Sequence, residues 1–532
     1  MSAALLSALL LGACMTPEEY RQSADEEVYA LLDERRMQLF AEPAGFNIEP
    51  PEDSLRQRIL RGEWTADEPL SLVDCLRIAA ENNRDYQSNK ESLYRVTLDV
   101  TLERWEFGNR GFASILGSTN GTFDDAGTAS VDSSGGVTRL LGSGAAIVAD
   151  IGIDLFRGLA TGDGWDVIGD LGLSVTQPLL RGAGELITKE NLTQAERDLV
   201  YEVRDFERFR RTFAVDVANE VYDLLQSINE LENEEQNYEN LVKLRERNQA
   251  LVEAGRLSDI EADQAEQDEL RSENRLIGLR GSLETQRDAF NLFLGLPIGT
   301  EFPLDPREFE RLTSEEDLLD QIDQDSAVNF ALGARLDFLT TLDTLEDSER
   351  QVLIAEDALR AGLSLSASVG SVSREGRPVD FRSDSSSWST ALNLDLPIDR
   401  VAERNAYRRS LIAFQAAERS TEERADSIQA TVRAAIRAAR NTRDSYIIQV
   451  GAEQLAERRV ESASLNLQAG RASTRDVLEA QEALVGAQNT KTSALIAFTL
   501  ARLELFLQLE VLRVDDEGIR TDEELLQRLI EN

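Results

Sequence analysis

The sequence contains no histidine, so it lacks the side chain most often used as a general base and as a zinc ligand. Basic residues are scarce too: 56 Lys and Arg stand against 98 Asp and Glu, which gives a net charge of −42. Binding to nucleic acid or to an anionic membrane surface depends on clustered cations. The composition therefore argues against both partners, and we expect no cofactor and no metal.

Long hydrophobic runs are missing as well. After the first residues no stretch of 18 apolar residues occurs, so no transmembrane helix is predicted. The short run "LSALLLGAC" predicts a signal peptide over residues 1–13, although residues 1–10 carry no Lys or Arg. Its end resembles a bacterial lipobox, which would make Cys14 a lipidation site; an ordinary signal peptide or a chance cysteine is the alternative. Cys75 is interpreted as a small core residue.

Proline is absent between Pro178 and Pro297 and again after Pro397. Within these stretches apolar residues recur at steps of three and four, as at Phe206, Phe209 and Phe213. This spacing is typical of a coiled-coil seam. A helix over residues 185–249 would be about 100 Å long. Such a helix needs neighbours along its whole length.

Other segments alternate strictly between apolar and small polar residues. In "SSSWSTALNLDLPI", Trp388, Leu392 and Leu394 share one face and Ser389 and Asn393 share the other. Each such run is about 9–11 residues long, which is the length of a tilted strand that crosses a bilayer. A soluble antiparallel sheet with one wet face gives the same pattern, so both interpretations stay open.

The order of segments is duplicated, over residues 70–296 and again over 326–510. Each half reads as helix, strands (within 108–181 and 361–398), a very long helix, a tight turn and a further helix. The turns share "AGR" followed by a serine, and the halves end in "LFLGL" and "LFLQL". We expect Gly255 and Gly470 to cap the long helices with positive φ, and Ser258 and Ser473 to start the next ones.

The duplicated pattern resembles the TolC-like outer-membrane efflux proteins. The marks are "SLVDCLRIAAENN" (residues 71–83), "LSVTQPLLRGAG" (173–184) and the two turns, the second continuing as "RDVLEAQEAL". The resemblance implies a mainly α protein with a membrane β-sheet and a homotrimer. Each protomer would give four strands to a shared 12-stranded β-barrel, which a long α-helical barrel continues into the periplasm.

The resemblance also implies an aperture at the second turn. Acidic residues just past that turn ring the entrance in the family, and the matching positions here are Asp476 and Glu479, three apart on one helix face. Three copies would favour cations and bind a blocking polyvalent cation. Candidate gate links are Glu261, Arg471 and Arg475. The alternative is that both acids only complement a helix N-terminus.

The first half carries three strand-like runs, 111–123, 145–156 and 165–180, yet a chain that returns to the periplasm crosses an even number of times. We therefore interpret one run as not spanning, and residues 122–164 as an outer loop or extra hairpin. Residues 373–386 are predicted as the second external loop. Residues 14–69 are predicted as a lipid-anchored linker that contains a helix over 26–40, and 297–325 and 511–532 as equatorial segments.

The leading function is an exit duct for a tripartite efflux pump or a type I secretion system, energised by inner-membrane partners through a periplasmic adaptor. Its place would be the bacterial outer membrane, extending into the periplasm. The alternative is a lipid-anchored coiled-coil scaffold without a pore, which has no need for apolar-out strands. An enzyme is disfavoured, because the only phosphate-loop-like stretch, "GSGAA" (residues 142–146), lacks its lysine. The sequence does not reveal the cargo.

Overall fold

A computed structural model describes residues 15–41, 45–64, 69–122, 125–159, 164–314, 319–515 and 518–531. Cys14 and the signal peptide lie outside the described residues. The helices are α2 (Pro17–Phe40), α3 (Leu55–Leu60), α4 (Leu72–Asn82), α5 (Arg84–Glu106), α6 (Glu185–Thr188), α7 (Glu190–Glu253), α8 (Asp259–Phe293), α9 (Glu308–Ser314), α10 (Gln324–Ala334), α11 (Leu336–Asp357), α12 (Val401–Gln468), α13 (Thr474–Gln508) and α14 (Glu523–Glu531). The strands are β1 (Arg110–Thr122), β2 (Asp125–Leu140), β3 (Ala146–Gly158), β4 (Asp166–Pro178), β5 (Gly362–Arg374), β6 (Arg377–Asp395), β7 (Leu512–Asp515) and β8 (Gly518–Thr521).

The chain forms two compact units, and each takes segments from both sequence halves. The sheet unit comprises residues 1–46, 92–203 and 340–422, and the helical unit comprises residues 47–91, 204–339 and 423–532. No helix in the described ranges is long and apolar enough to cross a membrane.

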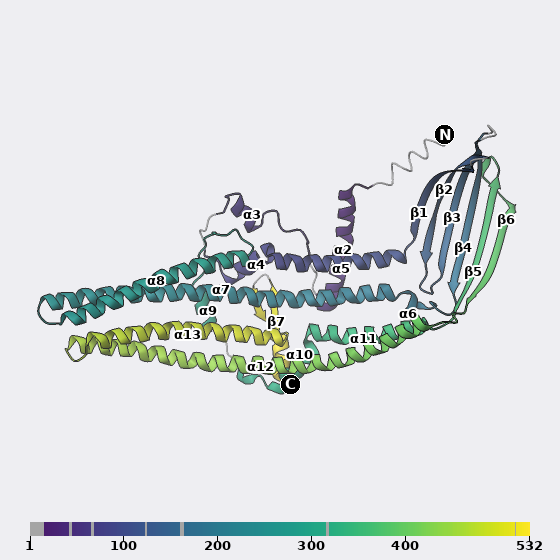
Figure 1. Cartoon of the computed structure of the whole chain (residues 1–532). Coiled ribbons are helices and arrows are strands. Elements are labelled where there is room, and N and C mark those ends of the chain that lie inside the picture. Colours follow the sequence, from purple (N-terminus) through teal and green to yellow (C-terminus); the bar gives the residue numbers. More distant parts are fainter. Residues whose placement is uncertain are drawn as a thin grey trace. The chain divides into compact units, whose positions relative to one another are not determined.

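The sheet unit holds one sheet of six strands in chain order, β1 to β6, and every neighbouring pair is antiparallel (Figure 1). Pairing of β4 with β5 joins the strands of the first half to those of the second. The two-residue turn at Glu375 and Gly376 connects β5 to β6, and Gly376 has φ +72°. Glycine suits this turn because L-residues rarely adopt positive φ.

The strand count corrects two predictions. All three strand-like runs of the first half are strands, and β2 is an additional one, so the first half supplies four strands and the chain supplies six rather than four. The even number of strands and the extra hairpin were right, whereas the outer loop was wrong. The interpretation that one of the three runs does not span is not supported, because the additional strand β2, rather than the loss of a run, makes the number even. Residues 373–386 are also not a loop, because β5 and β6 extend through most of them. Both segments are rich in Gly, Ser and Asp, and cross-strand pairing overrode that turn-forming composition.

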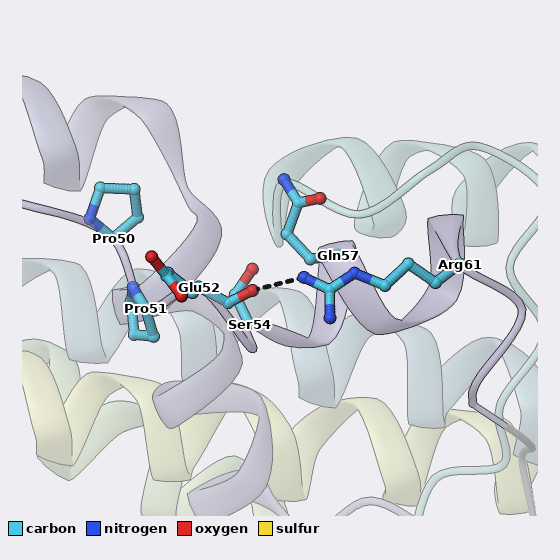
Figure 2. A pocket seen from close by; sticks show the side chains of 6 residues that line it. All are labelled: Pro50, Pro51, Glu52, Ser54, Gln57 and Arg61. Carbon is cyan, nitrogen blue, oxygen red and sulfur yellow. Dashed lines mark hydrogen bonds between the residues drawn. The ribbon is translucent and has the colours of Figure 1, made fainter.

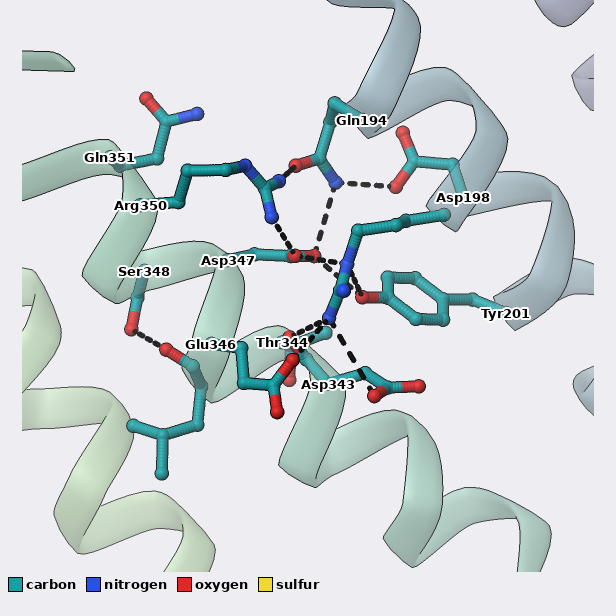
Figure 3. Close-up of polar contacts among 12 residues, drawn as sticks. Gln194, Asp198, Tyr201, Asp343, Thr344, Glu346, Asp347, Ser348, Arg350 and Gln351 are labelled. Carbon is teal, nitrogen blue, oxygen red and sulfur yellow. Dashed lines mark hydrogen bonds and ion pairs between the residues drawn. The ribbon is translucent and has the colours of Figure 1, made fainter. Parts of the chain in front are cut away.

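Within the sheet unit, the first part of α7 (residues 190–203) and most of α11 (residues 340–357) are joined by a half-buried polar network (Figure 3). Arg350 donates to Glu190 at 2.7 Å and to the side-chain oxygen of Gln194 at 2.6 Å. The hydroxyl of Tyr201 donates to Asp347 at 2.6 Å, and Asp347 also pairs with Arg350 at 2.8 Å. Each buried charge in this network has an oppositely charged partner, so neither helix carries an uncompensated charge at this contact.

The helical unit has two main hydrophobic cores. One packs α4 against α7 and α8 around residues such as Val217, Val221 and Phe290. The other packs α10 against α12 and α13 around residues such as Ile428, Val432 and Leu505. Cys75 lies in the first core with no exposed surface, and burial raises the pKa of its thiol, as expected of a small core residue rather than a reactive one.

Two predicted continuous helices are broken, at equivalent places in the two halves. The segment 70–107 splits into α4 and α5 at Asn83, and the segment 326–361 splits into α10 and α11 at Arg335; both residues are extended, with ψ 134° and 122°. The Asn83 amide donates to the carbonyl of Phe293 in "LFLGL", and Arg335 donates to Gln508 in "LFLQL". In both halves the residue at the break therefore donates to the segment that ends that half, although the acceptor is a backbone carbonyl in one half and a side chain in the other.

Candidate functional site

The sheet has one apolar and one polar face. A row across all six strands on the apolar face, read from the register, contains Gly111, Val137, Ala149, Leu173, Val369 and Trp388. The side chains of Leu173, Val369 and Trp388 are 49%, 56% and 78% exposed within one chain. An apolar surface this open on a single chain marks a surface that contacts lipid or another protein.

Charged residues on the apolar face occur near strand ends. Arg139 is paired with Ile147, and Arg157 is paired with Ala129 towards the other end of the same strands. The span from Ile147 to Arg157 is about 33 Å along the strand, or about 23–25 Å for a tilt of about 40–45°. The apolar band of membrane β-barrels is about 25 Å tall, so the two arginines bound a band of suitable height.

The opposite face is lined mainly by small polar residues, and it also carries Phe112 and Leu116 of β1 and Phe156 of β3. Hydroxyl pairs bridge neighbouring strands at Ser114 and Ser134 (2.8 Å), and at Ser368 and Ser389 (2.8 Å). These pairs satisfy polar groups across the strands without filling the space above them. The face is therefore suited to contact with water.

Four aspartates also lie on this polar face, and sequence reasoning missed them: Asp132, Asp150, Asp154 and Asp170. Asp132 is the direct cross-strand partner of Asp154, an arrangement of like charges that destabilises a sheet unless water screens it. Glycines stand opposite the other two, because a Cβ on Gly152 would come within 2.1 Å of Asp170 and one on Gly172 within 2.6 Å of Asp150. Asp150 and Asp154 are separated by an even number of residues along β3, and this spacing was the signal in the sequence that they share a face.

The tips of the helical unit form as expected. Gly255 has φ +67° and Gly470 has φ +69°. The residue after each glycine makes the same backbone hydrogen bond. The Arg256 N–H donates to the carbonyl of Leu251, and the Arg471 N–H donates to the carbonyl of Asn466, both at 2.8 Å. This is the Schellman pattern that terminates helices. Near the tips, Leu241 and Leu244 of α7 pack against Val477 and Leu478 of α13.

Asp476 and Glu479 lie on one exposed face of α13, whereas Val477 and Leu478 are buried. The Asp476 carboxylate accepts from the Ser473 N–H and from its hydroxyl, each at 2.8 Å. These two bonds hold the pKa of Asp476 below its ordinary value. Asp476 is therefore the N3 partner in the Ser473 capping box, and its side chain remains on the exposed surface of α13.

The candidate gate residues have local partners within one chain. Arg475 pairs with Glu479 at 2.8 Å on the same helix, and Glu261 accepts from the Ser258 hydroxyl at 2.9 Å as part of its own helix cap. Arg471 is exposed at the tip. Links between helices of neighbouring copies stay a prediction for all three residues.

We predict opposite effects for two glycine-to-alanine changes at α13 and the turn before it. Gly470→Ala forces a Cβ into left-handed backbone and should destabilise the tip by about 1–2 kcal/mol. Gly486→Ala, in the middle of α13 with open space around its Cβ position, should stabilise the helix by about 0.5–1 kcal/mol. Apparent melting temperatures followed by circular dichroism at 222 nm check the two signs; equal shifts would contradict the cap assignment.

Elsewhere among the described residues we find no cluster of side chains that indicates a binding or catalytic site. A surface pocket in the helical unit is lined by Pro50, Pro51, Glu52, Ser54, Gln57 and Arg61 (Figure 2). Its one cation, Arg61, donates to the Glu52 carbonyl at 2.8 Å. No group of three or more Cys, Asp or Glu in the described ranges is placed to hold a metal ion.

No protein-family model matches the chain, and no curated protein matches its sequence. Solved structures do match. VceC, an outer membrane protein of Vibrio cholerae, has 16% identity and a TM-score of 0.60 over 82% of this chain and 95% of that one. The Campylobacter jejuni outer membrane channel CmeC has 15% identity and a TM-score of 0.59 over 86% and 89%, and CusC has 14% and 0.59 over 82% and 91%. The chain therefore has the TolC-like fold of outer-membrane channels.

Proposed function

We propose that the protein is a trimeric outer-membrane exit duct. The observation that carries this proposal is the two-faced sheet in a channel fold: an apolar face about as tall as a bilayer core, backed by a face of serine, glycine and aspartate. An open sheet edge is not tolerated in lipid, so several copies have to close the wall. A coiled-coil scaffold gives no reason for either face.

In this proposal the sheet forms part of the barrel wall and the helical unit forms part of a periplasmic tunnel. The duct has no catalysis of its own, so an inner-membrane transporter supplies the energy, either in a tripartite efflux pump or in a type I secretion system. A periplasmic adaptor docks at the helical tips around Gly255 and Gly470. Lipidation at Cys14 adds an anchor in the outer membrane.

Asp476 and Glu479 would ring the aperture, with six carboxylates in a trimer. Removal of the charges is tested best with Asp476→Asn and Glu479→Gln together, because asparagine keeps an acceptor for the Ser473 cap. We expect a small cation-selective conductance in planar bilayers that a trivalent cation blocks in the wild type but not in the double variant.

The matched control removes two exposed acids at the other tip, Asp259→Asn with Asp263→Asn, and should keep the block. Equal loss of block in both double variants would remove the special role of the second tip. Conductance with unchanged block in every variant would leave the duct and return Asp476 and Glu479 to helix capping. A folded protein without conductance would contradict the duct.

A further inference from the structure

The sheet leaves two edge strands, β1 and β6, whose outer backbone groups have no partner strand within the described sheet. Natural proteins protect such edges with charges, prolines or very short strands. Here β1 has 13 residues and β6 has 19. Neither edge is short, so charge and proline content decide whether the edges are protected.

Both edges lack protection where they are long enough to cross a bilayer. Residues 111–122 of β1 contain no charged residue and no proline, and neither do residues 385–394 of β6. By contrast, the inner strands β2, β3 and β4 carry Asp132, Asp150, Asp154 and Asp170 in the corresponding region. Uncharged edges around a charged centre fit strands that pair with another chain in lipid.

The polar and apolar faces also continue to both edges, although Phe112 and Leu116 of β1 lie among the serines of the polar face. On β1, Ser114 and Ser118 share the polar face, and on β6, Ser387 and Ser389 share it. On the apolar face, Ile115 of β1 is 59% exposed and Leu392 of β6 is 64% exposed. An antiparallel pairing of β6 with β1 of the next copy keeps apolar residues on one side of the wall.

We propose that β6 of each copy pairs with β1 of the next, so that three copies close a barrel of eighteen strands rather than twelve. The count of three copies rests on the proposed function; the six strands of each chain come from the sheet itself. Barrel diameter grows roughly linearly with strand number, so the lumen is about 1.5 times wider than in a 12-stranded barrel. Barrels of about 16–18 strands hold an aqueous channel.

Closure within one chain is disfavoured by size and charge. About eight strands already give an interior that side chains fill, and six strands give less. The four aspartates of the polar face would then be packed into a dry core without cations, at a cost of several kcal/mol each. The polar face therefore needs a wide lumen, which several copies provide.

The test is a disulfide ladder between edges in the full-length protein. Ser114→Cys is combined in turn with Ser387→Cys, Ser389→Cys, Ala391→Cys and Asn393→Cys, all on the polar face, and oxidised in proteoliposomes. We expect at least one pair to give linked dimers and trimers on a non-reducing gel, with nothing larger. A matched control joins Ser114→Cys with Thr390→Cys on the opposite face and should give no ladder; single-cysteine variants should also give none.

Three results would overturn the eighteen-strand barrel. They are a ladder that ends at two chains, a ladder that continues beyond three chains, and the absence of a ladder from all four cysteine pairs. Conductance of the same preparations separates this from the proposed function. A three-chain ladder without conductance keeps the ring and removes the duct. Conductance with a two-chain ladder keeps a duct and removes the wide barrel.

Discussion

Ile151→Arg is expected to abolish insertion of the protein into membranes. Ile151 lies near the middle of β3 on the apolar face, between the levels of Arg139 and Arg157, and it is 47% exposed within one chain. An arginine at the bilayer midplane of a β-barrel costs about 2–4 kcal/mol per copy, so a trimer would bear about 6–12 kcal/mol. Liposome flotation, with protease protection of the floated fraction, measures the loss.

The matched control is Ser134→Arg, one strand away on the polar face. Ser134 is exposed and its cross-strand partner is Gly152, beside Asp170. An arginine there stays in water next to a carboxylate, so insertion should be unchanged. Equal insertion of both variants, or equal failure of both, would mean that the two faces do not have different surroundings.

Asp337→Asn is expected to destabilise the helical unit by about 3–5 kcal/mol, because it leaves the buried Arg335 without its carboxylate partner, whereas Arg208 keeps Glu510. Asp337 pairs with Arg335 at 2.8 Å and with Arg208 at 3.7 Å, and it also contacts Arg424. The Arg335 side chain is only 5% exposed. The apparent melting temperature of the helices in detergent, followed by circular dichroism, should fall by several degrees.

The same carboxylate predicts a pH dependence. Burial by itself raises the pKa of Asp337. The hydrogen bond from Arg335 and the charges of Arg208 and Arg424 lower it by more, so the pKa of Asp337 lies well below its ordinary value of 3.8. A lowered folded-state pKa gives stability that is present above the unfolded value and lost as the pH falls through the folded value. The wild type should therefore lose more stability than the variant as the pH falls below about 4.

Asp320→Asn is the control for this second prediction. Asp320 also pairs with an arginine, Arg443, at 2.9 Å, but its side chain is 80% exposed. Exposed pairs contribute about 0–1 kcal/mol, so its melting temperature should stay close to that of the wild type. A small effect of Asp337→Asn, no larger than that of Asp320→Asn, would contradict the buried charge cluster.

The long helices and tips could be predicted from the sequence because local signals agree there. Absence of proline, a seam of apolar residues and a repeated glycine turn all indicate the same structure, and α12 and its turn at Gly470 follow it. The helix breaks at Asn83 and Arg335 could not be predicted in the same way. Each break is held by a contact with a distant segment, at Phe293 or Gln508, which leaves no local signature.

Strand β2 was missed for a related physical reason. Its sequence offers only Val131, Val137 and Leu140 as large apolar residues among serines, glycines and aspartates, so composition favoured a loop. Between β1 and β3 the backbone is satisfied by neighbours, and small residues are enough. The aspartates of the polar face were missed with it, because their shared face exists only in the register of three strands.

The most direct test of the central claim is labelling of single cysteines along β5 in proteoliposomes with a charged, membrane-impermeant thiol reagent. Ser364, Ser366 and Ser368 lie on the polar face, and Leu365, Ala367 and Val369 lie on the apolar face. We predict rapid labelling at the three serine positions and protection at the other three, where a lipid-soluble thiol reagent should react instead. Labelling of both sets by the charged reagent at equal rates would contradict a channel wall with lipid on one side and water on the other.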